Sequence, residues 1–115
     1  MARAANEATT LTRGEIWMFG FQPPDQQRPV LVLTRPDMIG VLNTVTVAPV
    51  TRRIRGVPSE VVVGIDSGLK QESAINLHNL VTIPRSGLRR FVGTVSPAVL
   101  ARVRSALLFA LGFEP

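Results

Sequence analysis

The stretch RPVLVLT, residues 28–34, decides the fold of this chain. Its four consecutive aliphatic residues form the densest β-type run in the first half of the sequence, and they predict a strand. Pro29 has no N–H to donate to a neighbouring strand, so it is tolerated only at the start or the edge of a sheet. Arg28, just before the proline, is therefore held at the end of a rigid element that can aim its guanidinium at a ligand.

Further short β-type runs lie on both sides of this strand. They are separated by proline-containing or polar segments, such as residues 22–27, and by the turn signal Asp66-Ser67-Gly68. The predicted strands cover residues 13–21, 28–34, 43–50, 59–65, 73–77, 80–83 and 91–95. Six or seven short strands before one helix predict a mainly β fold, with a small, strongly bent sheet or barrel and a terminal helix packed against it.

The end of the chain has a helical pattern. Ser96 is a preferred N-cap residue, Pro97 suits the first helical position, and Gly112 is placed to end the helix. Between them, apolar residues recur at helical spacing. These are Val99, Leu100, Val103, Leu107, Leu108 and Leu111. We interpret this stripe as core packing.

Length and composition restrict the class of protein. The chain has 115 residues, which suits one domain, predicted over residues 13–115 after a flexible N-terminal leader at residues 1–12. It has no cysteine, which excludes a disulfide framework and a thiolate metal site. No signal sequence is visible, and no apolar run approaches the roughly 20 residues of a membrane span. We expect a cytoplasmic protein that does not contact a membrane.

The charge favours an anionic partner. The net charge is +5, and twelve of the thirteen basic residues are arginine. Arginine binds phosphate through a planar fork of donors, which favours nucleic acid or an acidic protein as partner, although GC-rich codon usage also raises arginine over lysine. Three arginines, at positions 52, 53 and 55, directly follow Thr51 and predict a contact with a nucleic-acid backbone. A second basic group could make the same contact or form solvated surface; it consists of Arg85, Arg89 and Arg90.

Several catalytic patterns are missing from the sequence. There is no Walker loop, dinucleotide fingerprint, zinc-ligand spacing or Gly-x-Ser-x-Gly elbow. The eight carboxylates are scattered and form no convincing two-metal cluster, and a single histidine excludes a two-histidine acid–base mechanism within one subunit. We therefore expect no metal and no cofactor.

Six segments of the sequence occur in a particular order and spacing. Together they indicate a protein family more specifically than any one segment does. They are RGEIW (13–17), RPVLVL (28–33), TVTVAPVT (44–51), GLKQES (68–73), Thr82-Ile83, and Gly93 with the helix that follows. In these features the chain resembles the MazF/PemK family of toxin endoribonucleases from type II toxin–antitoxin systems. The resemblance implies an SH3-like small barrel, a homodimer and metal-independent cleavage of single-stranded RNA. It also implies a cognate antitoxin whose acidic, flexible tail covers the RNA groove.

The resemblance further implies a catalytic pair. In the family, an arginine opens the Arg-Pro-Val strand and a threonine ends the next strand; here these are Arg28 and Thr51. Arg28 would bind the negative charge of a phosphorane transition state, and Thr51 would donate one hydrogen bond to it. The candidate RNA-binding residues are Gln27, Arg52, Arg53, Arg55, Ser73, His78 and Asn79. The cleavage sequence, and whether the target is mRNA, tRNA or rRNA, stays open.

Two other functions are compatible with these residues. One is a non-catalytic toxin of the same fold type that poisons DNA gyrase, and the other is a plain RNA-binding barrel. An endoribonuclease that uses the RNA 2′-hydroxyl leaves 2′,3′-cyclic phosphate and 5′-hydroxyl ends. A gyrase poison needs no phosphate site at Arg28, and a plain binder would shift RNA in a gel without cutting it.

Overall fold

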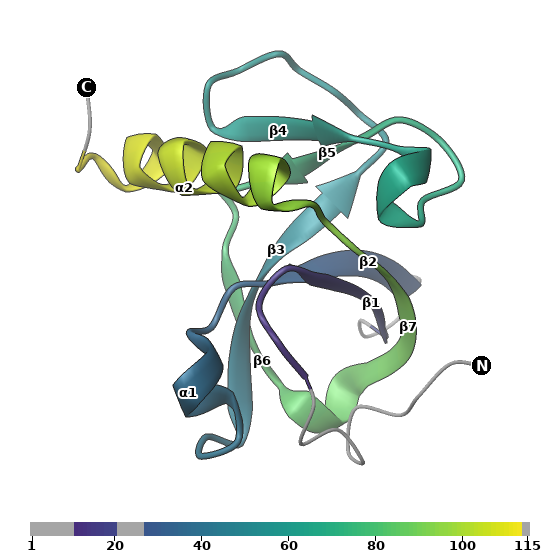
Figure 1. Ribbon diagram of the computed structural model, residues 1–115, viewed down its shortest axis with the longest axis vertical. Helices are drawn as coiled ribbons and strands as arrows, with labels where there is room; N and C mark the ends of the chain where they lie inside the picture. The colour runs from purple at the N-terminus through teal and green to yellow at the C-terminus, as the bar shows by residue number, and fades with distance from the viewer. Residues whose placement is uncertain (1–10, 21–26, 114–115) are drawn as a thin grey trace.

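The computed structural model describes residues 11–20 and 27–113, and it has seven strands followed by a C-terminal helix in this part of the chain (Figure 1). The strands are β1 (Glu15–Gly20), β2 (Gln27–Val32), β3 (Thr44–Thr51), β4 (Glu60–Val63), β5 (Ser73–Asn76), β6 (Val81–Pro84) and β7 (Leu88–Thr94). The helices are α1 (Pro36–Ile39) and α2 (Pro97–Leu111). The predicted mainly β fold with a terminal helix is confirmed, whereas the single turn α1 was not predicted.

Most of the predicted leader lies outside the described residues, as does the loop at residues 21–26. Of the leader's last two residues, Leu11 is buried and belongs to a core cluster with Trp17. The packed part of the chain therefore includes Leu11. Neither helix in the described part has the length and hydropathy of a bilayer span.

β3 joins the two parts of the sheet. Its first half pairs with β6, its middle pairs with β2 and its end pairs with β5, always antiparallel. The resulting strand order is β4-β5-β3-β2-β1-β7, with β6 beside β3. The β2–β3 pairing ends at Val30 and Pro49. The next residues of β3, Val50 and Thr51, pair with β5. The start of β2 and the end of β3 thus lie at the place where the two parts of the sheet separate.

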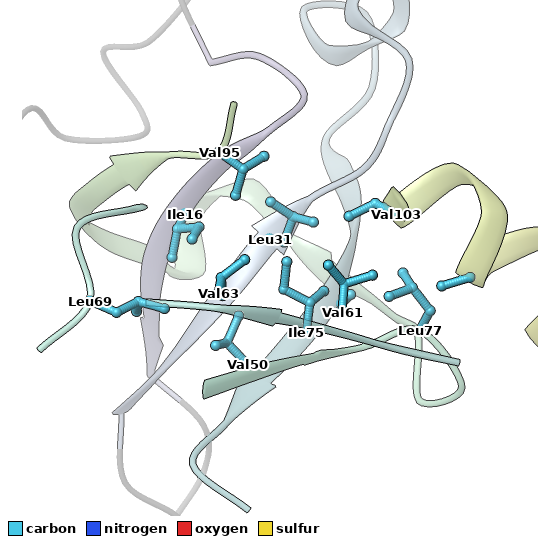
Figure 2. Close-up of a cluster of buried hydrophobic side chains, with 12 residues drawn as sticks. Ile16, Leu31, Val50, Val61, Val63, Leu69, Ile75, Leu77, Val95 and Val103 are labelled. Carbon is cyan, nitrogen blue, oxygen red and sulfur yellow. The ribbon is translucent and has the colours of Figure 1, made fainter. Parts of the chain in front are cut away.

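The continuous apolar run of β2 has a simple cause, because this strand is covered on both faces. Successive side chains of a strand point to opposite faces. Val30 and Val32 therefore enter one core cluster together with Trp17, while Leu31 enters another. All three β2 residues are fully buried. Figure 2 shows Leu31 within the second cluster, which also receives Val103 from α2.

The predicted caps of α2 are confirmed. The Ser96 side chain accepts a hydrogen bond of 3.2 Å from the backbone N–H of Val99, and Gly112 adopts a left-handed conformation with φ of 80°. The predicted core stripe is correct for Val103 but wrong for Leu111, which is 54% exposed. The reason is that α2 extends beyond β4 at its C-terminal end, so that its last turn has no sheet beneath it (Figure 1).

Two glycines hold the segment after β4 against β7. Gly68 ends the 3₁₀ turn Ile65–Ser67 with φ of 91°, a conformation that side chains disfavour. A Cβ atom on Gly68 would overlap the carbonyl group of Val92, and one on Gly93 would overlap the carbonyl group of Ser67. This contact between backbones places Ser67 and Gly68 against β7.

Replacing Gly93 with alanine is expected to lower the free energy of unfolding by about 1–3 kcal/mol, because the added methyl group has to displace backbone. The measurement is urea unfolding of the parent and the variant. Gly40→Ala is the matched control, since Gly40 has φ of −77° and its Cβ would meet nothing within 4 Å. We expect that control to stay within about 0.5 kcal/mol of the parent. Equal unfolding midpoints for the two variants would contradict the tight contact.

Candidate active site

A cavity of about 680 Å³ lies where β2 and β3 separate. Its walls come from β1, β2, β3, β7, the start of β5 and the segment that precedes β5. The lining residues are Met18, Gln27, Arg28, Pro29, Val50, Thr51, Arg52, Gly68, Leu69, Lys70, Gln71, Ser73, Arg90 and Val92. The structure thus brings Arg28 and Thr51 into one cavity, although they are 23 positions apart in the sequence.

A row of residues across four strands forms the floor. Met18 of β1 is opposite Pro29 of β2 on one side and opposite Arg90 of β7 on the other. Val50 of β3 also lines the cavity, one residue beyond the last β2–β3 pair, Val30 and Pro49. Neighbouring strands lie about 4.8 Å apart, and residues opposite each other share a face. The floor is therefore apolar over three strands and ends on a guanidinium at β7.

Arg28 lies one residue beyond this row, at the open end of β2. Thr51, at the end of β3, lines the same cavity. The Arg28 side chain is exposed, and it makes no hydrogen bond or ion pair to any other residue in the described ranges. The backbone that carries it runs directly into the fully buried part of β2. A guanidinium with free donors is thus mounted on a rigid strand.

Thr51 presents a hydroxyl group whose orientation is restricted. It is half-buried, and its oxygen accepts a hydrogen bond of 3.1 Å from the backbone N–H of Arg53. Because this bond occupies a lone pair, the hydroxyl proton points elsewhere. That proton has no acceptor among the described residues. Thr51 is therefore prepared to donate a hydrogen bond to a ligand.

The lining of the cavity is strongly positive. It carries four cations, Arg28, Arg52, Lys70 and Arg90, and no carboxylate occurs among the described residues that line it. All four side chains are exposed, and none makes an ion pair within residues 11–20 and 27–113. Clustered cations in a hollow raise the local concentration of an anion, and guanidinium forks suit phosphate in particular.

Three of the predicted RNA-binding residues line this cavity: Gln27, Arg52 and Ser73. Gln27 is exposed at the start of β2, whereas Ser73 is buried. The Ser73 hydroxyl donates a hydrogen bond of 3.1 Å to the carbonyl oxygen of Gln71. Ser73 consequently shapes the wall that carries Lys70 and Gln71.

The other predicted RNA-binding arginines do not line the cavity. Arg53 and Arg55 are exposed on the segment between β3 and β4. Glu60 holds that segment, because its Oε1 accepts hydrogen bonds of 3.0 Å from the backbone N–H groups of Arg55 and Gly56. These two arginines can contact RNA only if the bound RNA extends beyond the cavity.

His78 and Asn79 also lie outside the cavity, in the turn that follows β5. Ser73 is at the other end of β5, about five residues or roughly 16 Å along the strand. The Nδ1 atom of His78 is hydrogen-bonded to the Ser59 hydroxyl at 2.5 Å. The structure does not bring this pair together with Arg28 and Thr51, so their recognition role stays a prediction.

Two cations of the site were not among the predicted site residues. Lys70 was not singled out, and Arg90 was grouped with Arg85 and Arg89, for which a nucleic-acid contact and solvated surface were both open. That group is in fact divided. Arg85 is half-buried and donates a hydrogen bond of 3.0 Å to the carbonyl oxygen of Ile39, and Arg89 does not line the cavity. Of this adjacent pair only Arg90 lines the cavity, whereas Arg89 lies at an irregularity in the β1–β7 register with its guanidinium beside Gly20.

Comparison with known proteins identifies the family. Residues 12–111 match the family model described as PemK-like, MazF-like toxin of type II toxin-antitoxin system. The chain belongs to this family. The resemblance to the MazF/PemK family that the sequence shows is thereby confirmed.

The relatives of this MazF-like chain include mycobacterial proteins. It is 42% identical over 88 residues to Endoribonuclease MazF3 of Mycobacterium tuberculosis, which covers 76% of the chain and 82% of the relative. It is 33% identical over 103 residues to Probable endoribonuclease MazF2 of the same organism, covering 89% and 99%.

Solved structures of MazF proteins have the same fold. Mycobacterium tuberculosis toxin MazF-mt6 matches with a TM-score of 0.79 and 35% identity, covering 85% of this chain and 96% of that chain. A crystal structure of MazE-MazF from Deinococcus radiodurans matches with a TM-score of 0.76 and 28% identity, covering 89% and 96%. The predicted MazF-like barrel is confirmed by these matches.

Proposed function

We infer that this chain is the toxin of a type II toxin–antitoxin pair and that it is an endoribonuclease. The observation that carries the proposal is the cavity in which Arg28 and Thr51 meet two further arginines and a lysine. RNA supplies the phosphates that such a cavity suits. The relatives named above as endoribonucleases favour this activity over gyrase poisoning or plain RNA binding.

The proposed reaction uses the 2′-hydroxyl of the RNA as an internal nucleophile. The 2′-oxygen attacks the adjacent phosphorus, and the bond from phosphorus to the 5′-oxygen of the next nucleotide breaks. One proton leaves the 2′-hydroxyl and one reaches the departing 5′-oxygen. The products are a 2′,3′-cyclic phosphate and a 5′-hydroxyl, and water is not consumed in this step.

Arg28 and Thr51 act on the transition state in this proposal. The pentavalent phosphorane carries more negative charge on its non-bridging oxygens than the ground state does. The Arg28 guanidinium can donate to two of these oxygens, and the Thr51 hydroxyl to one. Preorganised donors of this kind are commonly the largest single contribution to catalysis. Arginine stays protonated in proteins, so protonation of the leaving 5′-oxygen suits Arg28 better than proton abstraction.

The partners follow from the same charge. A cognate antitoxin with an acidic, flexible tail would compete with RNA for the positive cavity, and this kind of partnership is represented by the MazE-MazF complex from Deinococcus radiodurans. We further propose that the chain acts as a homodimer in the cytoplasm, where RNA and antitoxin are available. No metal ion takes part in the proposed reaction.

The proposal is tested by incubating the purified protein with total RNA in the presence of EDTA and sequencing the fragment ends. We expect cleavage at a short recurrent sequence, with 5′-hydroxyl ends. A parallel incubation with gyrase and supercoiled DNA tests the alternative. Intact RNA together with linearised DNA would identify a gyrase poison, and a gel shift without cutting would identify an RNA-binding module.

A further inference from the structure

The positive charge of the cavity lies on two sides of an apolar floor. Arg28 and Arg52 belong to the side of β2 and β3, next to Thr51. Arg90 belongs to β7, on the other side of Met18. Lys70 lies two residues after Gly68, whose backbone contacts Val92 and Gly93 of β7, the strand of Arg90. The cavity therefore has two groups of cations rather than one.

The separation of the two groups is set by the sheet. Met18 is the residue between Pro29 and Arg90 in the row across the strands, so the backbones of β2 and β7 are two strand spacings, or about 10 Å, apart. The surface between them is apolar, with Pro29, Met18 and Val92 all half-buried in the lining. One phosphate bound by Arg28 and Thr51 leaves Arg90 facing the next part of the ligand.

We propose that Lys70 and Arg90 form a second phosphate-binding subsite, which holds an RNA phosphate neighbouring the scissile one while the intervening nucleotide lies over the apolar floor. This inference rests on the proposed endoribonuclease function. The order of cations, apolar surface and cations matches the order of phosphate, nucleoside and phosphate in single-stranded RNA. The subsite touches no reacting atom, so it binds and positions the substrate without stabilising the phosphorane.

This division of roles predicts which kinetic constant changes. Arg90→Gln and Lys70→Gln are each expected to raise KM by roughly tenfold, the size of one charge-assisted hydrogen bond, with kcat unchanged. Each is also expected to reduce the salt dependence of binding by a slope of about 0.7, the value for one phosphate contact on a single strand. Arg89→Gln is the matched control, because it removes the same charge from the next residue of β7, outside the cavity.

The sharpest test removes the charge from the RNA instead. A series of oligonucleotides carries one neutral methylphosphonate at successive positions around the cleavage site. One neighbouring position is expected to raise KM roughly tenfold or more for the parent and for Arg89→Gln, to raise it less in Arg90→Gln, where only the Lys70 contact is left to lose, and to add nothing in the double variant Lys70→Gln/Arg90→Gln. A penalty at every position that is the same in Arg90→Gln as in the parent would overturn the subsite.

Binding of an uncleavable analogue, with a 2′-O-methyl group at the cut site, separates this inference from the proposed activity. If the parent does not cut RNA but Arg90→Gln still weakens analogue binding relative to Arg89→Gln, the subsite stands and the nuclease proposal falls. If the parent cuts RNA and Arg90→Gln matches it in KM, salt slope and analogue affinity, the nuclease stands and the subsite falls.

Discussion

Replacing Arg28 with alanine is expected to lower kcat for RNA cleavage by about 10²–10³-fold, the usual loss when a preorganised donor to the transition-state charge is removed. The side chain is exposed and makes no contact by hydrogen bond or ion pair with the rest of the described chain, so stability should change by less than about 0.5 kcal/mol. Single-turnover cleavage of a defined RNA in EDTA measures the rate, and urea unfolding measures the stability.

Three further variants test whether the loss of rate is due to the planar guanidinium of Arg28. Arg28→Lys keeps the charge without the planar fork, and an intermediate rate is expected. Thr51→Val removes only the hydroxyl donor and should cost about 10–100-fold, since one charge-assisted hydrogen bond is lost. Arg104→Ala removes an exposed arginine on α2, remote from the cavity lining, and should cut at the parental rate. An Arg28→Ala protein that is folded and as fast as its parent would exclude the proposed mechanism.

The strand and helix that carry the fold were predictable because their signals are local. The aliphatic run of β2 is continuous since the strand is buried on both faces, and this pattern is readable without any partner strand. The caps of α2 depend on Ser96 and on Gly112, which act through the adjacent turn of the same helix. The exposure of Leu111 was not predictable, because it depends on how far α2 extends beyond the start of β4 (Figure 1).

One error accounts for both a missed strand start and a missed site residue. The last strand was predicted to begin at residue 91, whereas β7 begins at Leu88. Arg89 and Arg90 are both exposed, so they read as loop residues, yet both belong to β7, and Arg90 is paired with Met18 of β1. Assigning Arg90 to the cavity requires its register opposite Met18, a contact between residues 72 positions apart. The pairing of two strands this far apart in the chain cannot be predicted from residue spacing in one sequence.

The prediction of Arg28 and Thr51 had different support. Both positions come from the family resemblance, in which an arginine opens one strand and a threonine ends the next, and antiparallel neighbours bring those two ends together. Arg53 and Arg55 were added because they follow Thr51 in the sequence. On an exposed segment, however, proximity along the chain does not keep side chains together, and both leave the cavity that Arg52 still lines.

A single 2′-deoxynucleotide on the 5′ side of the scissile phosphate is expected to abolish cleavage at that phosphate, the largest effect that we predict. The substitution removes the nucleophile itself, whereas a protein variant removes only part of the stabilisation of the transition state. Binding should change little, since the phosphates that contact Arg28 and Arg90 are intact. The measurement compares the cleavage rate and the affinity of the deoxy-substituted oligonucleotide with those of the all-RNA strand.

A second oligonucleotide, with the deoxynucleotide placed on the 3′ side of the scissile phosphate, is the matched control and should be cut normally. If the first oligonucleotide is still cut, the nucleophile is not the 2′-hydroxyl, and an external water molecule has to attack instead. The fragment ends then distinguish the two routes, because water attack leaves no cyclic phosphate. Arg28 and Thr51 would keep a role in that case, since a pentavalent phosphorus formed by either nucleophile carries the charge that their donors stabilise.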